Sequence, residues 1–581
     1  MTTDTHSLDL DSGLSSTRQS NTFNQKSEQD STHGSHDENE PKVFAGQDLE
    51  YQGALGDEAS EYQSMADDTV SRTMSRRLLG AEELYKEASH LSLPLPTMGG
   101  GKPYPPMLPD RDPYAVSFDG QDDLSFPHNW SLTKKIITCF AVGLSAFTVS
   151  VGSAIFAEGS EEIMATYHVG SVVATLGTSL YVFGFASGPV IWGPLSELYG
   201  RKFVLVPSIF GFICFTMAVG AAQDIQTIMI CRFFAGFVGA APLVVAPASM
   251  ADIFNAVSRG KAMTNFAMVL FGGPMLAPIL GGFIVKNPGL GWRYCSYFSG
   301  IIGVLSLIGI VFFMDETHHG LILVRKAELL RRRTNNWGIH APHETVSLSL
   351  KEICEKNITR PLVMLFTEPI LFLITLYNAF IYGLLYLFLT AVPMIFIGEY
   401  GFTQGVGQLP YISMLVGVFL GGFLSLFLDK KYARTIKENG GKIIPEARLP
   451  PMMIGGVIFA IGLFWLGWSG SYPNKVHWIV PTIGAAPVGM GLILIFLPCL
   501  NYIIDCYLLF AASALAGNAF LRSAFGAAFP LFARQMFTNM KIKWAATLLG
   551  CVSVLLVPVP FLFYKYGKSI RRKSKYAFDL S

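Results

Sequence analysis

Uninterrupted apolar segments of about twenty residues recur along the chain from Ile136 onward. A helix of that length crosses the roughly 30 Å hydrocarbon core of a lipid bilayer. The pattern predicts an all-α membrane protein with twelve transmembrane helices, because a globular core does not bury so many separate segments of this length. The predicted spans form two groups of six: 136–157, 171–192, 203–222, 226–247, 262–284 and 295–314, then 367–396, 408–428, 451–469, 478–499, 507–532 and 544–564.

Polar stretches frame the two groups of spans. Residues 1–130 are rich in Ser, Thr, Asp, Glu, Gln and Gly and show no sustained apolar periodicity. Such a stretch buries too little apolar area to offset the entropy of ordering, so we expect it to be disordered. The predicted organisation is a disordered tail at 1–130, a six-helix half at 131–314, a central polar loop at 315–366, a second six-helix half at 367–566 and a tail at 567–581.

Composition agrees with a membrane protein and excludes other classes. The chain of 581 residues is 51% hydrophobic and 15% charged, with a net charge of +1, whereas soluble domains carry about 25% charged residues. A charge this close to zero disfavours a nucleic-acid binder. Most of the cysteines lie in apolar runs without CxxC spacing, and His318, His319, His340 and His343 lack carboxylate or thiol neighbours. We therefore expect no metal site, no cofactor and solvated loop histidines.

Lysines and arginines gather on one side of the predicted spans. Lys134, Arg201 and the arginine-rich 315–366 loop fall on that side, whereas the opposite loops carry Glu158 and Glu399. Positive residues stay in the cytoplasm during insertion, so both termini are predicted to be cytoplasmic. Lys475, Lys541 and Lys543 fall on the opposite side.

The loop between spans two and three has the most specific sequence. Residues 193–202 read GPLSELYGRK, a glycine-bounded turn with Glu197 and the basic pair Arg201 and Lys202. Alone, it is equally explained as a polar turn with positive anchors. The order of these residues resembles the cytoplasmic loop motif of the major facilitator superfamily. With Glu197 in place of the usual Asp, it looks like the form found in fungal drug:proton antiporters with twelve spans.

Two further segments extend the resemblance. Arg232 lies inside the apolar fourth span, where a buried guanidinium needs a polar partner or a water-filled cavity. Segment 272–282 reads GGPMLAPILGG and resembles the fifth-span motif of exporters in the same superfamily. Glycines there permit close helix approach, and prolines remove backbone donors so that the helix can bend. The residues concerned are Gly273, Pro274, Pro278, Gly281 and Gly282.

The resemblance extends from about Trp130 to Lys575. It implies a proton-coupled exporter of the fungal polyamine and multidrug branch, which works by alternating access between two halves. A proton-coupled importer on the same fold and a non-transporting nutrient receptor are the alternatives. Gly567-Lys-Ser569 lacks the earlier glycine of a phosphate-binding loop, because Leu562 stands there. An ATP-driven pump is therefore disfavoured, and no enzymatic activity is expected.

Charged residues inside or beside the spans are the candidate functional groups. Glu158 is the favoured proton-carrying acid, and Arg232 would bias the pKa of a partner or organise water. Aromatic rings attract cations, so a cationic or amphipathic cargo is expected, although ordinary helix packing is the more common reason for such rings. The candidate cavity residues are Tyr181, Tyr377, Asn378, Tyr382 and Arg522. We expect a monomer in the plasma membrane, with the vacuolar membrane as second choice.

Overall fold

The computed structural model describes residues 114–120, 123–345, 355–438, 444–572 and 574–577. Most of the predicted N-terminal tail, residues 1–113, lies outside the described residues. Within them, eleven helical segments are long and apolar enough to cross a membrane. The all-α membrane architecture predicted from the hydrophobic pattern is therefore confirmed.

Six of these segments form the first half. Each extends a few residues beyond its apolar run, because the polar ends of a transmembrane helix protrude from the hydrocarbon. The helices are α2 (Leu132–Ala154), α4 (Ser171–Tyr199), α5 (Arg201–Ala221), α6 (Ile225–Ile253), α7 (Ala256–Lys286) and α8 (Arg293–Phe313). The 3-10 turn η4 (Ile155–Gly159) and the short helix α3 (Ser160–Tyr167) follow α2.

The second half contains the other segments. They are α12 (Pro369–Pro393), α13 (Tyr411–Glu438), α14 (Pro450–Gly470), α15 (Ile479–Cys506), and α16 (Ala511–Leu556) continuing into α17 (Pro558–Arg571). The last segment covers 61 residues, about 90 Å of helix and far more than one crossing needs. Its helical geometry breaks at Lys541, which has φ 63° and ψ 155°. This residue divides the segment into spans eleven and twelve.

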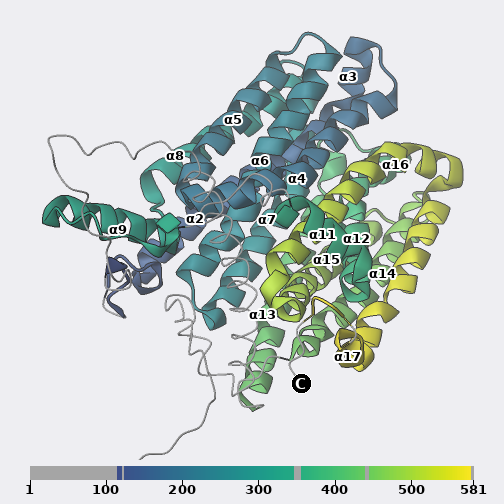
Figure 1. Cartoon of the computed structure of the whole chain (residues 1–581). Coiled ribbons are helices and arrows are strands. Elements are labelled where there is room, and N and C mark those ends of the chain that lie inside the picture. Colours follow the sequence, from purple (N-terminus) through teal and green to yellow (C-terminus); the bar gives the residue numbers. More distant parts are fainter. Residues whose placement is uncertain (1–113, 121–122, 346–354, 439–443, 573, 578–581) are drawn as a thin grey trace, which may run out of the picture.

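The two halves lie side by side, the first in blue and teal and the second in green and yellow (Figure 1). Across the boundary α4 packs against α16 and α7 against α13. We call the end of the bundle that carries η4 and α3 the Glu158 end, and the opposite end, where α5 begins, the Arg201 end. In Figure 1, α3 lies at the top and α17 at the bottom.

The outer surface of the helices is apolar. Phe140, Phe312 and Leu555 are 71%, 75% and 75% exposed. A soluble bundle would carry charged side chains at such positions, and large contiguous apolar surfaces there would aggregate in water. This surface is suited to lipid.

A small packed platform lies beside the first half at the Arg201 end. Helix α9 (His319–Thr334) carries Ala327, which packs with Val116 and Ala341. Lys326 pairs with Asp119 at 2.8 Å. We expected residues up to 130 to be disordered and residues 315–366 to form a polar loop. Residues 114–120 and 123–130 instead pack onto α9.

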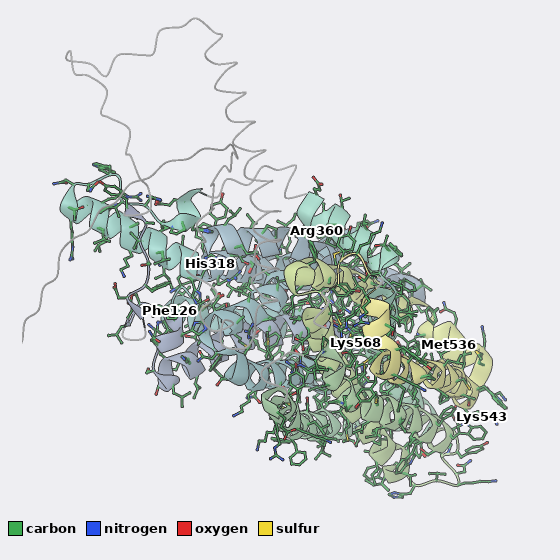
Figure 2. The ribbon with its side chains drawn as sticks, turned by 60° about the horizontal axis from the view of Figure 1, so that its bottom comes forward. Phe126, His318, Arg360, Met536, Lys543 and Lys568 are labelled. Carbon is green, nitrogen blue, oxygen red and sulfur yellow. The ribbon has the colours of Figure 1, made fainter. Side chains whose placement is uncertain are left out.

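The loop histidines belong to this platform, contrary to their predicted solvation. The His319 ring nitrogen Nε2 lies 2.9 Å from the carbonyl oxygen of Asp252, and Nε2 of His343 lies 3.3 Å from that of Leu198. Burial, helped by the charge of Arg201, lowers the pKa of His318 to about 3. His318 is therefore neutral at ordinary pH. Figure 2 shows His318 and Phe126 together on this side.

Candidate functional site

Arg232 is buried inside the first half, with 3% of its surface exposed. Its guanidinium donates from Nη1 to the carbonyl oxygen of Gly152 (2.8 Å), from Nη2 to that of Ser153 (3.4 Å) and from Nε to that of Gly177 (3.0 Å). The first two carbonyls belong to the last turn of α2, where helix oxygens lack helical partners and carry partial negative charge. Arg232 therefore caps α2 and links it to α4.

Two aromatic rings complete this pocket. The guanidinium carbon lies 4.3 Å from the ring centre of Tyr181 and 4.5 Å from that of Phe156. The Tyr181 hydroxyl donates to the carbonyl oxygen of Val149 at 2.8 Å. The expected polar partner of Arg232 is thus a set of carbonyls and rings, and one face of Tyr181 is taken by the protein's own cation.

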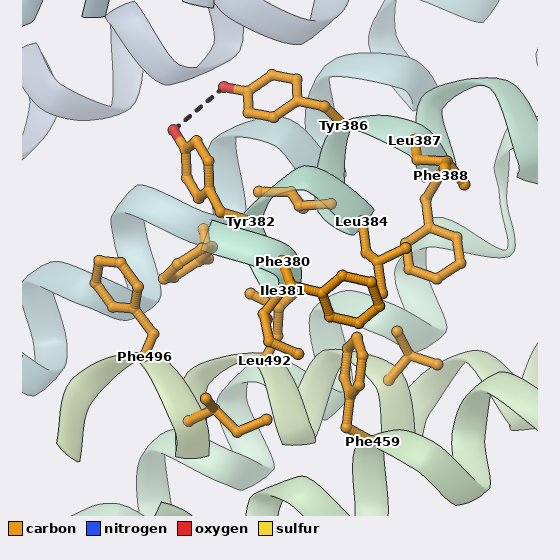
Figure 3. Packing of buried hydrophobic residues seen from close by; sticks show 14 of the residues in the cluster. Phe380, Ile381, Tyr382, Leu384, Tyr386, Leu387, Phe388, Phe459, Leu492 and Phe496 are labelled. Carbon is orange, nitrogen blue, oxygen red and sulfur yellow. Dashed lines mark hydrogen bonds between the residues drawn. The ribbon is translucent and has the colours of Figure 1, made fainter. Parts of the chain in front are cut away.

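A chain of hydroxyl groups leads from this pocket to the second half. Ser153 Oγ lies 2.9 Å from the Tyr386 hydroxyl. The Tyr386 hydroxyl is 3.5 Å from the Tyr382 hydroxyl, the contact drawn as a dashed line in Figure 3. The guanidinium carbon of Arg522 lies 4.9 Å from the ring centre of Tyr382 and 5.2 Å from that of Phe496. The buried Nε of Arg522 has no hydrogen-bond partner among the described residues. Ser153 and Tyr386 were not predicted, although Tyr386 follows Tyr382 by one helical turn.

The other two predicted cavity residues lie within the second half. Asn378 donates from Nδ2 to Oδ1 of Asn518 at 3.0 Å, and Asn518 donates to Thr375 at 3.2 Å. Tyr377 faces Gly456 of α14, and its hydroxyl is unpaired within the described residues. Only Tyr382 and Arg522 of the predicted second-half residues therefore belong to the group that reaches the first half.

Glu158 lies at the boundary between the halves. It is 7% exposed, and Oε2 of its carboxylate accepts a 2.6 Å hydrogen bond from Nε2 of Gln408. Gln404 donates to the Glu158 carbonyl oxygen at 3.3 Å. No ion pair of the described residues includes Glu158. The sequence did not reveal Gln408, because an amide in a loop carries no motif.

The glycine-rich segment of α7 packs directly against this boundary. A Cβ atom at Gly281 would lie 3.0 Å from Cγ of Glu158, and one at Gly282 would lie 2.8 Å from Cγ of Gln408. Gly273 faces Ser150 of α2. Pro274 and Pro278 lie inside α7, which remains a continuous helix. The small residues therefore let α7 approach α2, η4 and the second half at once.

The predicted polar turn at the Arg201 end is built around two carboxylates. Gly200 has φ +95°, which favours glycine. Glu316 accepts hydrogen bonds from the backbone nitrogens of Arg201 (2.8 Å) and Lys202 (3.1 Å), and so caps α5. Arg201 pairs with Asp252 at 3.0 Å. Glu197 of the same motif is exposed.

The second half contains a matching pair that the sequence motif did not predict. Arg448, just before α14, pairs with Asp505 near the end of α15 at 3.0 Å. Arg201 and Asp252 occupy the same places in the first half, at the start of its third and the end of its fourth helix. Asp429, near the end of α13, also lies 3.8 Å from Arg448. The internal repeat is therefore visible as geometry.

Comparison with known proteins agrees with this architecture. The sequence profile of the Major Facilitator Superfamily matches residues 138–530. The multidrug transporter FLU1 of Candida albicans is 64% identical over 94% of this chain and 90% of its own. The multidrug transporter TPO1_2 of Candida glabrata is 53% identical over 84% of this chain and 83% of its own.

A solved structure shares the fold. The partially occluded inward-open form of the xylose transporter XylE from E. coli superposes with a TM-score of 0.53 at 16% identity, covering 75% of this chain and 98% of that one. This similarity supports the fold alone. The profile match and the close fungal relatives show that the chain is a transporter, not an enzyme, and that it belongs to the Major Facilitator Superfamily, in its branch of fungal multidrug transporters.

Proposed function

We propose that the protein exports amphipathic drugs and polyamines in exchange for protons, by alternating access. Glu158 carries this proposal, because it is a buried carboxylate at the contact between the halves. A carboxyl group that is buried in one conformation and reaches water in another can take up and release a proton during the cycle. The names of the relatives FLU1 and TPO1_2 support drug export.

In the described conformation the two halves are in contact at the Glu158 end. Gln408 and Gln404 bind Glu158 there, and Nζ of Lys286 donates to Oγ1 of Thr403 at 3.3 Å. The Arg201–Asp252 pair stays within the first half, and the Arg448–Asp505 pair within the second. Rocking of the halves would separate Glu158 from Gln408 and open this end.

The charges near the contact constrain where a cationic cargo binds. Arg232 and Arg522 each cover a ring, so their positive charge repels a cation from Tyr181 and Tyr382. We therefore place the cationic group of the cargo near Glu158, and its apolar body against Tyr382, Tyr386 and Phe496. This arrangement lets the cargo compete with the proton for Glu158.

We propose that the Arg201 end of the bundle faces the cytoplasm. Lysines and arginines at the Arg201 end support a cytoplasmic position for that end and for both termini. We further propose that the protein works as a monomer in the plasma membrane.

Flux in proteoliposomes tests the transport proposal. Purified protein is reconstituted, a pH gradient is imposed in either direction, and movement of a cationic dye and of spermidine is followed. Proton entry should drive the cargo the opposite way. Movement of cargo and protons in the same direction would establish the importer, and absence of flux would establish the receptor.

A matched pair of variants tests the assignment of Glu158. Glu158→Gln should abolish gradient-driven flux and weaken binding of a cationic cargo, because the amide neither releases a proton nor carries a negative charge. Exchange of a labelled for an unlabelled uncharged amphipathic drug should continue. Glu161→Gln removes an exposed carboxylate three residues away and should transport normally. Normal gradient-driven flux by Glu158→Gln would contradict the assignment.

A further inference from the structure

The chain folds back after α17 and covers a buried carboxylate at the start of α12. Glu368, directly before α12, is 3% exposed. Its Oε2 accepts a hydrogen bond from the Ser574 hydroxyl, and its Oε1 accepts one from the backbone nitrogen of Lys575 at 3.2 Å. The Tyr507 hydroxyl donates to Oε2 at 3.3 Å. Residues 574–577, which we call the docked segment, thus share Glu368 with the loop before α16.

Ser574 holds the docked segment together. Its Oγ donates to Glu368 and also accepts from the backbone nitrogens of Tyr576 (3.2 Å) and Ala577 (2.8 Å). The Tyr576 ring packs edge-on against Phe510 at 5.4 Å. Every one of these contacts depends on the small neutral hydroxyl at position 574, or on the turn that it makes.

The sequence before Ser574 is basic. Arg571 and Arg572 precede it by three and two residues. Protein kinases with acidic substrate grooves select serines preceded by arginines at these positions, because guanidinium groups pair with carboxylates in the groove. Arg571 ends α17 and pairs with Glu446 at 2.8 Å. A kinase therefore needs both the docked segment and the last turn of α17 released before it can bind the arginines in extended form.

We propose that Ser574 is a phosphorylation site for such a kinase and that its phosphate keeps the docked segment released from Glu368. In the reaction Oγ of Ser574 forms a bond to the γ-phosphorus of ATP. The bond from that phosphorus to its bridging oxygen breaks, ADP leaves, and the hydroxyl proton passes to the catalytic base of the kinase.

Phosphate and docking exclude each other for two reasons. Phosphorylation removes the proton that Ser574 donates to Glu368, and it places about two negative charges beside a buried carboxylate. Since the kinase binds only the released form and the phosphate prevents its return, modification shifts the population toward release. Release uncovers Glu368 at the start of α12.

In the cell the proposal rests on the cytoplasmic position of the C-terminus. The test avoids that condition by using purified full-length protein in lipid nanodiscs, where both faces are accessible. The protein is treated with ATP and the catalytic subunit of cyclic-AMP-dependent kinase, and the modified residue is located by mass spectrometry. Hydrogen exchange of the amides of Lys575, Tyr576 and Ala577 then reports docking. A peptide containing Lys326 of the platform serves as internal reference.

Phosphate should appear on Ser574 and not in Ser574→Ala. It should speed exchange of the Lys575 amide at least about tenfold, since that amide loses its charge-assisted hydrogen bond to Glu368. Glu368→Gln should be phosphorylated severalfold faster than wild type, whereas the exposed control Glu355→Gln should match it. The wild-type protein alone can overturn the proposal. Absence of phosphate at Ser574 would do so, and so would phosphate at Ser574 with unchanged hydrogen exchange. Equal rates for the two variants would overturn the link to docking.

Discussion

Two arginines are embedded in the bundle, one in each half, and their surroundings differ. Arg232 donates to three carbonyl oxygens and covers two rings. Arg522 also covers two rings, but its buried Nε has no hydrogen-bond partner among the described residues. The same side chain therefore stabilises the fold in the first half and is left with unused hydrogen-bonding capacity at the contact between the halves.

An embedded charge is therefore not by itself evidence for a transport site. A buried cation without a carboxylate is tolerated where a helix end supplies carbonyls, as α2 does for Arg232. Where such groups are missing, the charge is available to cargo, water or a second conformation. Arg232→Ala and Arg522→Ala test this contrast directly.

The largest effect is expected for Arg232→Ala. It leaves the carbonyls of Gly152, Ser153 and Gly177 without their partner, at a cost of about 3 kcal/mol or more in the free energy of unfolding. Thermal unfolding in detergent measures it, together with the loss of efflux. Arg522→Ala is the matched control and should cost less than about 1 kcal/mol. Equal losses in the two variants would contradict the comparison.

Arg522→Ala should instead change selectivity. Removing one positive charge near Tyr382 lowers the repulsion of a cationic group by about 1–2 kcal/mol at the effective dielectric of a protein. We expect the ratio of cationic to anionic dye transport to rise about tenfold, measured in the same proteoliposomes. A ratio equal to that of the wild type would show that cargo does not approach Arg522.

Tyr386→Phe tests the hydroxyl contact between the halves. It removes a hydrogen bond to Ser153 worth about 1 kcal/mol, so the described conformation should lose about fivefold in population to the alternative. Distances between spin labels on α7 and α13 measure the shift. Tyr377→Phe removes a hydroxyl that is unpaired in the described part of the chain and should leave the distances unchanged.

The smallest effect is expected for Glu197→Gln. This carboxylate is exposed in the described conformation, so unfolding should change by no more than about 0.5 kcal/mol. Glu316, which follows α8, contacts this turn. Glu316→Gln weakens the cap of α5 and should cost about 1 kcal/mol. A larger loss from Glu197→Gln than from Glu316→Gln would assign the motif acid a structural role here.

The hydrophobic pattern predicted the spans because lipid requires long apolar helices, and each span therefore has an apolar run long enough to be seen in the sequence. It placed Arg232 inside a span but could not identify its partners, since carbonyl groups carry no sequence signal. The break at Lys541 was equally hidden, because positive φ at lysine has no preferred sequence. Pairs such as Glu158 and Gln408 join residues far apart in the chain and emerge only in three dimensions.

The platform around α9 was missed for a related reason. Its core is small, with Val116, Ala327 and Ala341 drawn from three separate polar stretches. None of these stretches has enough apolar residues to indicate structure alone. Only their association buries them.

The polar contact between the halves has an energetic consequence. The bonds Ser153–Tyr386, Glu158–Gln408, Gln404–Glu158 and Lys286–Thr403 contribute about 1 kcal/mol each, or about 4 kcal/mol together. One proton that crosses two units of pH and 100 mV releases about 5 kcal/mol. The free energy released by a single proton per cycle therefore matches the free energy needed to break these bonds. The described conformation is stable enough to be a resting state, and one proton supplies enough free energy to leave it.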